Sequence, residues 1–249
     1  MTPPLAVSDR PVPSGVIRTL RMDRPAARNA MDTSLLAAFV DALEDADADP
    51  TVRGVLIAGG ESVFSAGADV REQVEDGGTR RSDLFIHLYA RLSTFRLPTA
   101  AAVEGAAVGG GAEVAAACDV RVAGHSALFR FPGAIYGIPI GAARTVGLVG
   151  LGTAKDWVLS SRDVPAEEAH RAGFVQVLCE DGAAEAHAST WLELVASRDP
   201  ATVELMKRTL ADFSGLGDRV AWENDALRAF QEASGILPRL DRNPARRPG

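Results

Sequence analysis

The sequence predicts an α/β fold in which a core of alternating strands and helices precedes a helical C-terminal region. Short apolar runs of strand length alternate with helical patterns as far as residue 123, and helical patterns dominate from Gly152 onward. This order of elements favours a mixed core that carries a helical subdomain. The chain has 249 residues. A chain of this size buries roughly 70–75% of its unfolded surface, which suffices for one core without disulfides or metals.

The first part of the chain is expected to hold strands at 16–22, 52–58, 99–103 and 119–123. The run 52–58 is nearly continuously apolar, which is typical of a parallel strand buried on both faces. Asp32 or Thr33 can cap a helix over 32–47. The apolar residues of that helix fall on one face, as a helix packed on a core requires: Leu35, Leu36, Phe39, Val40 and Leu43. A second helix is expected over 83–95, after a polar surface loop at 70–82.

The second part of the chain is expected to be mainly helical, with one strand at 174–178 and helices at 153–161, 165–172, 183–197, 200–213 and 218–234. Four residues of the helix 183–197 recur at i, i+3, i+4 and i+7 and form an apolar stripe: Ala188, Trp191, Leu192 and Val195. We interpret this stripe as an association surface. The predicted division is a loose leader at 1–13, a core at 14–195, and a helical region with a basic Pro/Arg tail at 196–249.

Composition and motif searches exclude several classes of function. The formal net charge is −7, which argues against a nucleic-acid-binding face. Cys118 and Cys179 lack metal-type spacing, as do the four histidines, so no metal site is expected. No apolar run approaches the ~18 residues of a membrane span, and no basic, apolar signal peptide precedes the core. We therefore expect a cytoplasmic protein with no membrane or nucleic-acid partner.

Two glycine-containing turns are the main candidates for a functional site. Residues 64–69 (FSAGAD) follow a buried strand, and residues 109–113 (GGGAE) open a short helix. Glycine lets the backbone approach a ligand closely and leaves N–H groups exposed. Two N–H groups that converge on one oxygen form an oxyanion hole. The alternative is that both segments are only tight turns, because glycine runs alone are weak signals.

Glu113 lies three residues beyond Gly110, in the first turn of the expected helix. A carboxylate there can act as an acid or base beside an anion-binding helix start. The alternative is structural, because the helix dipole favours glutamate in a first turn.

At these residues the chain resembles the crotonase superfamily, also called the enoyl-CoA hydratase/isomerase family. Four segments carry the resemblance, in order and at ordinary family spacing: RPAARNAM (24–31), VRGVLIAGGESVFSAGADV (52–70), LPTAAAVEGAAVGGGAEVAAACDVRVA (97–123) and AKDWVLSSRDVPAEEAHRAGFV (154–175). The resemblance implies a spiral of ββα units with a helical C-terminal trimerisation region. It also implies a homotrimer, or a hexamer of two trimers.

The family acts on acyl-CoA thioesters, so the resemblance implies an acyl-CoA substrate, with coenzyme A as part of that substrate and no separate cofactor. By position, the oxyanion hole would be the backbone N–H groups of Ala68 and Gly110. The remaining implied ligand contacts are with the thioester arm and the nucleotide: Arg28, Ala30, the region near Ala27, Ala66, Gly67, Asp69, Val70, Arg71 and Gly109.

The family's hydratases carry two glutamates, and this chain matches one of them. Glu113 matches the first, whereas Gly133 stands in the place of the second. The next loop also differs from the family pattern, because Ala143 and Arg144 stand where the family usually has a glycine pair. Three side chains are candidates to compensate in the pocket: Tyr136, Arg130 and His87. A Gly133→Glu change is expected to restore a second acid if this loop follows the family path.

Three functions remain open at this point. The first is an enoyl-CoA hydratase, isomerase or related lyase that uses Glu113 alone as acid and base. The second is an acyl-CoA-binding homologue with little or no turnover. The glycine at position 133 supports this hypothesis, whereas the retained Glu113 is evidence against it. A scaffold that acts only through its trimer helices is the third.

Overall fold

The computed structural model describes residues 3–73 and 78–234. Its larger sheet has the strand order β1-β2-β3-β5-β7-β10. β1 pairs with β2 in antiparallel orientation, and every other neighbouring pair in this sheet is parallel. The strands of this sheet are β1 (Leu5–Val12), β2 (Gly15–Met22), β3 (Val52–Ala58), β5 (Thr99–Val103), β7 (Val120–Gly124) and β10 (Val177–Cys179).

The smaller sheet has the order β4-β6-β8-β9. β4 and β8 each pair with β6 in parallel, and β9 is antiparallel to β8. Its strands are β4 (Val63–Ser65), β6 (Ala106–Val108), β8 (Leu128–Arg130) and β9 (Val164–Pro165). Successive strands from β3 to β8 alternate between the two sheets, and a helix follows each pair. This alternation is the spiral of ββα units that the family resemblance implied.

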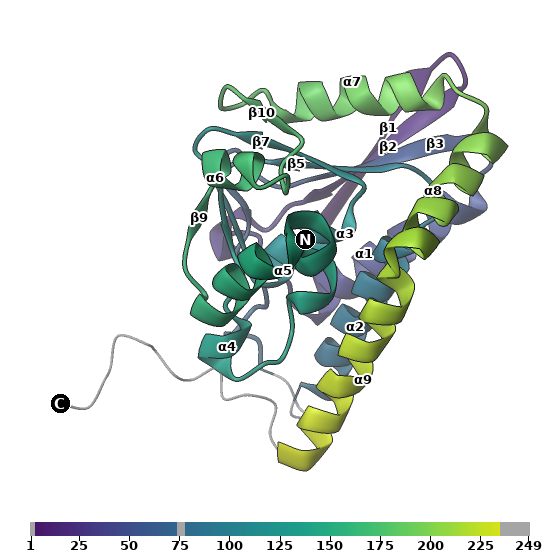
Figure 1. Cartoon of the computed structure of the whole chain (residues 1–249). Coiled ribbons are helices and arrows are strands. Elements are labelled where there is room, and N and C mark those ends of the chain that lie inside the picture. The colour runs from purple at the N-terminus through teal and green to yellow at the C-terminus, as the bar shows by residue number, and fades with distance from the viewer. Residues whose placement is uncertain (1–2, 74–77, 235–249) are drawn as a thin grey trace.

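The helices cover these sheets (Figure 1). A short 3-10 turn, η1 (Pro25–Ala27), precedes them, and their bounds are α1 (Thr33–Ala48), α2 (Thr79–Ser93), α3 (Gly110–Ala117), α4 (Gly133–Tyr136), α5 (Ala142–Ser160), α6 (Ala166–Arg171), α7 (Ala184–Ala196), α8 (Pro200–Ser214) and α9 (Leu216–Ser234). α7 lies across the larger sheet, whereas α8 and α9 form one side of the molecule, with α2 packed against α9 (Figure 1).

The expected loose leader at 1–13 is wrong for most of its length. Residues 5–12 form strand β1, which pairs with β2 from Leu5 opposite Met22 to Val12 opposite Gly15. Only Leu5 is buried in β1, so its polar residues gave no apolar pattern to identify it. The loop expected at 70–82 is also too long, because α2 begins at Thr79. Residues 74–77 and 235–249, which include the expected Pro/Arg tail, lie outside the described residues.

The apolar stripe on α7 serves the chain's own core, which corrects its interpretation as an association surface. Ala188 and Leu192 are fully buried, and Trp191 packs against the same cluster. α7 contacts β3, β5 and β7 of the larger sheet. A single amphipathic face therefore cannot be assigned to a partner chain from its periodicity, because the sheet of the same chain is an equally good acceptor.

Two further elements differ from expectation because of local packing. The strand expected at 174–178 starts only at Val177, because Phe174 is fully buried and packs edge-on against three aromatic rings: Phe129, Phe131 and Trp157. The helix expected at 153–161 is the second part of α5, whose first part begins at Ala142. Gly150, at φ +77°, separates the two parts.

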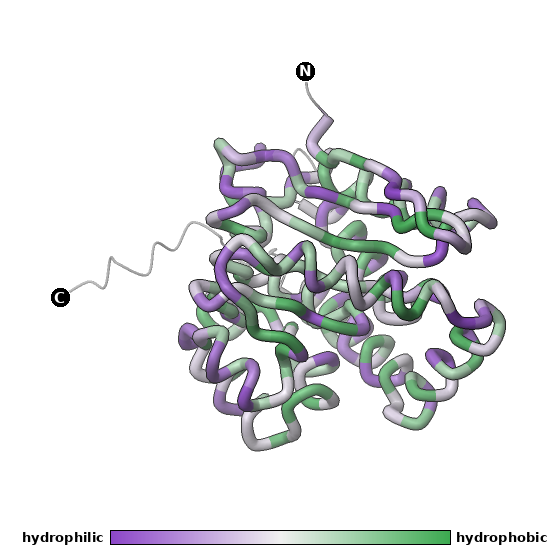
Figure 2. Tube along the Cα trace, turned by 90° about the horizontal axis from the view of Figure 1, so that it is seen from above, coloured by the Kyte–Doolittle hydropathy of each residue, from purple (hydrophilic) through white to green (hydrophobic). Residues whose placement is uncertain are grey.

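The core is continuous between α1 and the two sheets, and a second cluster lies under α7. In the view from above, long hydrophobic stretches run through the middle, and hydrophilic residues gather mostly at the outer turns (Figure 2). Among the described helices, none is both long and apolar enough to cross a bilayer. The described residues also contain no cluster of three or more metal-ligating side chains.

Candidate active site

The two glycine turns meet at one edge of the smaller sheet. β4 ends at Ser65 and β6 ends at Val108, and the two strands are parallel neighbours. Because parallel strands present their carboxyl ends at the same edge, the turns that follow them lie side by side. The order of strands thus brings together two segments that are 42 residues apart in the sequence.

Glycine is required for this approach. A Cβ on Gly67 would lie 2.6 Å from the Val108 oxygen and 3.1 Å from the Gly110 nitrogen. Gly67 also has φ +87°, a conformation that a side chain disfavours. A Cβ on Gly111 would lie 2.6 Å from the Ser65 oxygen. The glycines therefore have a steric role in joining the two turns, beyond their role as turn residues.

Ala68 and Gly110, whose backbone N–H groups are the candidate oxyanion hole, line the resulting pocket. Within the described part of the chain, neither group donates a backbone or side-chain hydrogen bond. The groups around Ala68 are paired, because the Met31 N–H donates to the Gly67 oxygen at 2.7 Å and the Asp69 N–H donates to the Met31 oxygen at 2.9 Å. The pairing holds the turn rigidly and leaves the Ala68 N–H for a ligand. Gly110 is the first residue of α3, where N–H groups have no partner in the helix.

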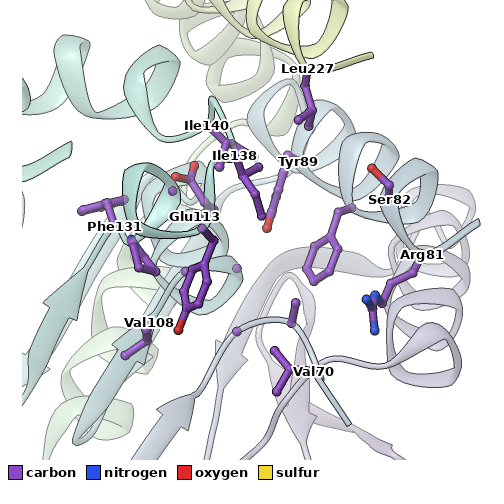
Figure 3. Close-up of a pocket in the computed structure, with 18 of the residues that line it drawn as sticks. Val70, Arg81, Ser82, Tyr89, Val108, Glu113, Phe131, Ile138, Ile140 and Leu227 are labelled. Carbon is purple, nitrogen blue, oxygen red and sulfur yellow. The ribbon is translucent and has the colours of Figure 1, made fainter. Parts of the chain in front are cut away.

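The pocket beside these groups has a volume of about 180 Å³ and is mainly apolar. Figure 3 shows Val70 on one side of it, Leu227 of α9 on the opposite side, and Arg81 and Ser82 of α2 on a third. Its apolar lining comes from segments that are far apart in the sequence: Val70, Phe85, Val108, Phe131, Pro132, Ile138, Ile140 and Leu227. Ala66, Gly67, Ala68, Gly109, Gly110, Glu113, Gly133 and Tyr136 also line it, which joins most of the residues that the sequence singled out.

Glu113 lines the pocket from α3 and is joined to a buried arginine. Nε of Arg144 donates to Oε2 of Glu113 at 2.7 Å, and Nη2 of Arg144 donates to Oε2 of Glu223 at 3.0 Å. The three side chains are between 1% and 5% exposed. Oε1 of Glu223 accepts three backbone N–H groups at the start of α5, at 2.8–3.1 Å: Gly141, Ala142 and Ala143.

Burial raises the pKa of the Glu113 carboxyl to about 7. The Arg144 guanidinium opposes this rise in pKa, and the Glu223 carboxylate adds to it. A carboxyl with a pKa near neutrality is suited to both taking up and releasing a proton at pH 7. Environment therefore distinguishes Glu113 from an ordinary first-turn glutamate.

Tyr89 of α2 is a pocket residue that sequence reasoning missed. Its ring lies 4.9 Å from the Arg144 guanidinium carbon. Its hydroxyl oxygen lies 3.0 Å from where a Cβ on Gly110 would stand, and it faces the pocket (Figure 3). Burial, with the nearby Glu113 charge, raises the pKa of this phenol well above its usual value, so Tyr89 is a neutral hydroxyl at pH 7.

Some of the residues expected to contact CoA do not line the pocket: Arg28, Ala30, Asp69 and Arg71. Asp69 is buried, where its carboxylate accepts from Arg24 at 3.0 Å and from the Arg71 N–H at 3.0 Å. Arg71 and Arg28 are exposed, and the Arg28 carbonyl accepts the Ala66 N–H at 3.0 Å. Ala30 is buried beside them and can offer only its backbone.

His87 and Arg130 do not belong to the pocket, which corrects the expectation that they could compensate for Gly133. The side chain of His87 is 55% exposed, with Nε2 lying 4.0 Å from Glu44. Nε of Arg130 donates to the Ser161 carbonyl at 2.8 Å, and its Nη1 lies 3.6 Å from Asp163. Both residues neighbour the site in sequence, but their helix or strand turns them outward.

A model of the family described as enoyl-CoA hydratase/isomerase matches residues 13–226. The chain belongs to the enoyl-CoA hydratase/isomerase family, the crotonases. The match spans every strand of both sheets except β1 and continues into α9. It therefore includes both glycine turns, Glu113, Arg144 and Glu223.

Individual family members agree with this assignment. The chain is 37% identical over 195 residues to the 2,3-dehydroadipyl-CoA hydratase of Escherichia coli, covering 77% of this chain and 76% of that one. It is 32% identical over 203 residues to the short-chain-enoyl-CoA hydratase of Clostridium acetobutylicum, covering 79% and 78%. The crystal structure of an enoyl-CoA hydratase from Mycobacterium smegmatis superposes with a TM-score of 0.78 at 27% identity, covering 93% of this chain and all of that one.

The close approach at Gly111 predicts a stability difference between two glycine-to-alanine variants. Gly111→Ala should lower the free energy of unfolding by about 1–3 kcal/mol, because its Cβ meets the Ser65 backbone. Gly152→Ala in α5 is the control, because a Cβ there has nothing within 4 Å. It should raise stability by roughly 0.5–1 kcal/mol through helix propensity. Denaturant unfolding that gives the two variants equal stability would contradict the tight contact.

Proposed function

We propose that the protein is an enzyme that acts on an acyl-CoA thioester through an enolate, with Glu113 as its acid–base residue. The observation that carries this proposal is the meeting of three parts in one apolar pocket: the N–H groups of Ala68 and Gly110, and the buried carboxyl of Glu113. Family membership supports the substrate class. Two of the relatives are named as hydratases of enoyl-CoA or dehydroadipyl-CoA.

The oxyanion hole supplies the electrostatic part of this mechanism. The thioester oxygen sits between the Ala68 and Gly110 N–H groups. When a proton leaves the α carbon, or when water adds to the β carbon of a 2-enoyl thioester, negative charge develops on that oxygen. Two fixed N–H donors in a pocket with little water stabilise this charge more than they stabilise the neutral thioester, which lowers the barrier.

Glu113 supplies the proton transfer. In a double-bond isomerisation, one carboxylate takes a proton from one carbon and returns it to another, so a single residue suffices. In a hydration, Glu113 also has to hold the water, take its proton and pass that proton to the α carbon. The neutral Tyr89 hydroxyl, which faces the same pocket, is available to hydrogen-bond such a water.

The loop at Gly133 supports a site with one carboxylate. A Cβ on Gly133 would lie 2.5 Å from the Ile138 oxygen and 2.9 Å from the Ile140 oxygen. Both atoms belong to the backbone, so a glutamate there requires the loop to move. The expectation that Gly133→Glu restores a second acid therefore does not fit this loop. The geometry favours isomerisation, or a hydration in which Glu113 acts alone.

The thioester arm of CoA would run past residues 66–71, and its nucleotide would reach the exposed Arg28. Arg28 is suited to this role because a protein with a net charge of −7 must supply cations locally for the CoA phosphates. We also propose that the protein works in the reducing cytoplasm, which its two buried, unpaired thiols support.

A trimer, or a hexamer of trimers, is the proposed assembly, and the exposed face of α8 supports it. No residue of α8 is buried. Four large apolar side chains on it are between 53% and 86% exposed: Leu205, Met206, Leu210 and Phe213. Trp222 of α9 is 75% exposed as well. Apolar surface of this extent usually marks an association site.

Glu113→Gln tests the proposed function. Glutamine keeps the size of the side chain but cannot take up the proton. The variant should therefore lower kcat by roughly 10²–10⁴ for a 2-enoyl-CoA or 3-enoyl-CoA, whichever the parent converts. Its affinity for the acyl-CoA should stay within a few-fold, as measured by calorimetry. Undiminished turnover in the variant would remove Glu113 from the mechanism. A parent that binds both substrates tightly and converts neither would instead establish an acyl-CoA-binding protein.

The assembly predicts the effect of a charge on α8. Sedimentation equilibrium of the parent should give three or six times the mass of one chain. Phe213→Glu should dissociate it, because the charge would have to be buried against a second copy. Val7→Glu on β1 is the control, since Val7 is 52% exposed and lies on an edge strand of the larger sheet. A monomeric parent at micromolar concentration would refute the proposal.

A further inference from the structure

Three helices contribute charged or titratable groups around Glu113. Tyr89 approaches from α2, Arg144 from α5, and Glu223 from α9. Strands β4, β5 and β6, which also pack against α3, contain no titratable residue. The charge state of Glu113 therefore depends on one cation and one further carboxylate, both of which are buried.

Arg144 fixes the catalytic carboxyl in one orientation. Its Nε engages Oε2 of Glu113, so Oε1 is left for proton transfer. The guanidinium is itself held on two other sides, by Glu223 and by the face of the Tyr89 ring. In the described part of the chain its Nη1 has no hydrogen-bond partner, so the cation is retained here at a cost in stability. A residue kept at such a cost is a candidate for a functional role.

Glu223 connects this arrangement to the C-terminal helix. Its carboxylate accepts three N–H groups from the start of α5 and one from Arg144, which leaves it little freedom to move. The next turn of α9 places Leu227 in the wall of the acyl pocket. The position of α9 thus determines both part of the pocket wall and the anchor of Arg144.

We propose that Arg144 and Glu223 are positioning residues: Arg144 orients Glu113 and favours its ionised form, and Glu223 anchors Arg144 from α9. The inference rests on the proposed function, since it concerns the residue assigned there as acid and base. It assigns to α9 a role in setting the charge of the site, and it explains an arginine where the family usually has glycine.

The two residues act on Glu113 with opposite sign. Removing the Arg144 cation takes away a favourable partner and raises the pKa of Glu113, so less carboxylate is present at neutral pH. Replacing Glu223 by glutamine takes away a repulsive charge, while the Nε contact with Glu113 and the Tyr89 ring still hold Arg144 in place, so the pKa of Glu113 falls. A base must be ionised to act, so its activity rises as pH increases through its pKa. Arg144→Met should therefore move the acid limb of the pH–rate profile to higher pH, and Glu223→Gln should move it to lower pH.

The direct experiment follows the titration of Glu113 by ¹³C NMR in protein labelled at the glutamate carboxyl carbons, with Glu113→Gln used to assign the signal. The parent should titrate near pH 7. Each variant should shift the midpoint by about one pH unit, which is a tenfold change in proton affinity, upward for Arg144→Met and downward for Glu223→Gln. Where the parent turns over, the acid limb of kcat/KM should move in the same directions.

Arg121→Met is the control for the loss of a buried arginine. Arg121 is also fully buried, but it donates to the backbone carbonyls of Phe174, Ala115 and Cys118 rather than to Glu113. Its loss should lower the melting temperature and leave the Glu113 titration in place. If Arg144→Met does not fold, Glu223→Gln carries the test alone, because glutamine retains an oxygen for the α5 N–H groups.

The inference is overturned if the Glu113 signal titrates at the same pH in Glu223→Gln as in the parent, or if Arg121→Met shifts it equally. This outcome is distinct from failure of the proposed function. If Glu113→Gln abolishes turnover but neither positioning variant moves the titration, the function stands and the inference fails. If the titration moves as expected in a protein that converts no enoyl-CoA, the positioning role stands and the catalytic function fails.

Discussion

The contact between two glycine turns at the edge of the smaller sheet is the constraint on which the site depends. Gly67 and Gly111 have no room for a side chain against Val108 and Ser65. That contact sets the spacing between the N–H groups of Ala68 and Gly110, and it places the first turn of α3, with Glu113, beside them. The groups that we propose as catalytic are thus held by backbone packing between parallel strands, rather than by flexible side chains. Preorganisation of this kind is what stabilisation of a developing oxyanion requires.

A buried charge network is the second layer of the site. Glu113 and Glu223 share one guanidinium, that of Arg144, in a region that is nearly closed to water. Two carboxylates and one cation leave an excess negative charge, and burial makes that charge costly, which is the physical origin of a Glu113 pKa near neutrality. Where a second acid is missing at Gly133, the site has an arginine in contact with Glu113. In the mechanism that we propose, this side chain connects proton transfer at Glu113 with the docking of α9.

The mixed α/β core, both glycine turns and Glu113 as a candidate could be predicted from local sequence patterns: an apolar run followed by glycine, or a glycine run that opens a helix. The spiral of ββα units was implied only by the resemblance to the family. β1 could not, because an edge strand with one buried residue has no apolar alternation to read. The direction in which a side chain points could not be predicted from the sequence either. His87 and Arg130 lie near the site in sequence and point away from it, whereas Tyr89 lies two positions beyond His87 on α2 and points in.

Arg144 shows what cannot be predicted from the sequence alone. The sequence marked it as a departure from the family's glycine pair, and yet only the packing of α3, α5 and α9 reveals that it meets Glu113. The contact joins positions 31 residues apart, and the second contact, to Glu223, spans 79 residues. No periodicity or spacing rule carries that information. The stripe on α7 is a second example. Its helical periodicity was predicted correctly, but the surface against which it packs was not.

The most direct test of this account is the position of the thioester oxygen in a crystal structure with a bound, saturated acyl-CoA. The account predicts that this oxygen lies about 2.7–3.1 Å from both the Ala68 and the Gly110 nitrogens, with the acyl chain in the apolar pocket and the Glu113 carboxyl facing the carbons next to the thioester. A thioester oxygen bound away from either nitrogen, or an acyl chain outside the pocket, would contradict it.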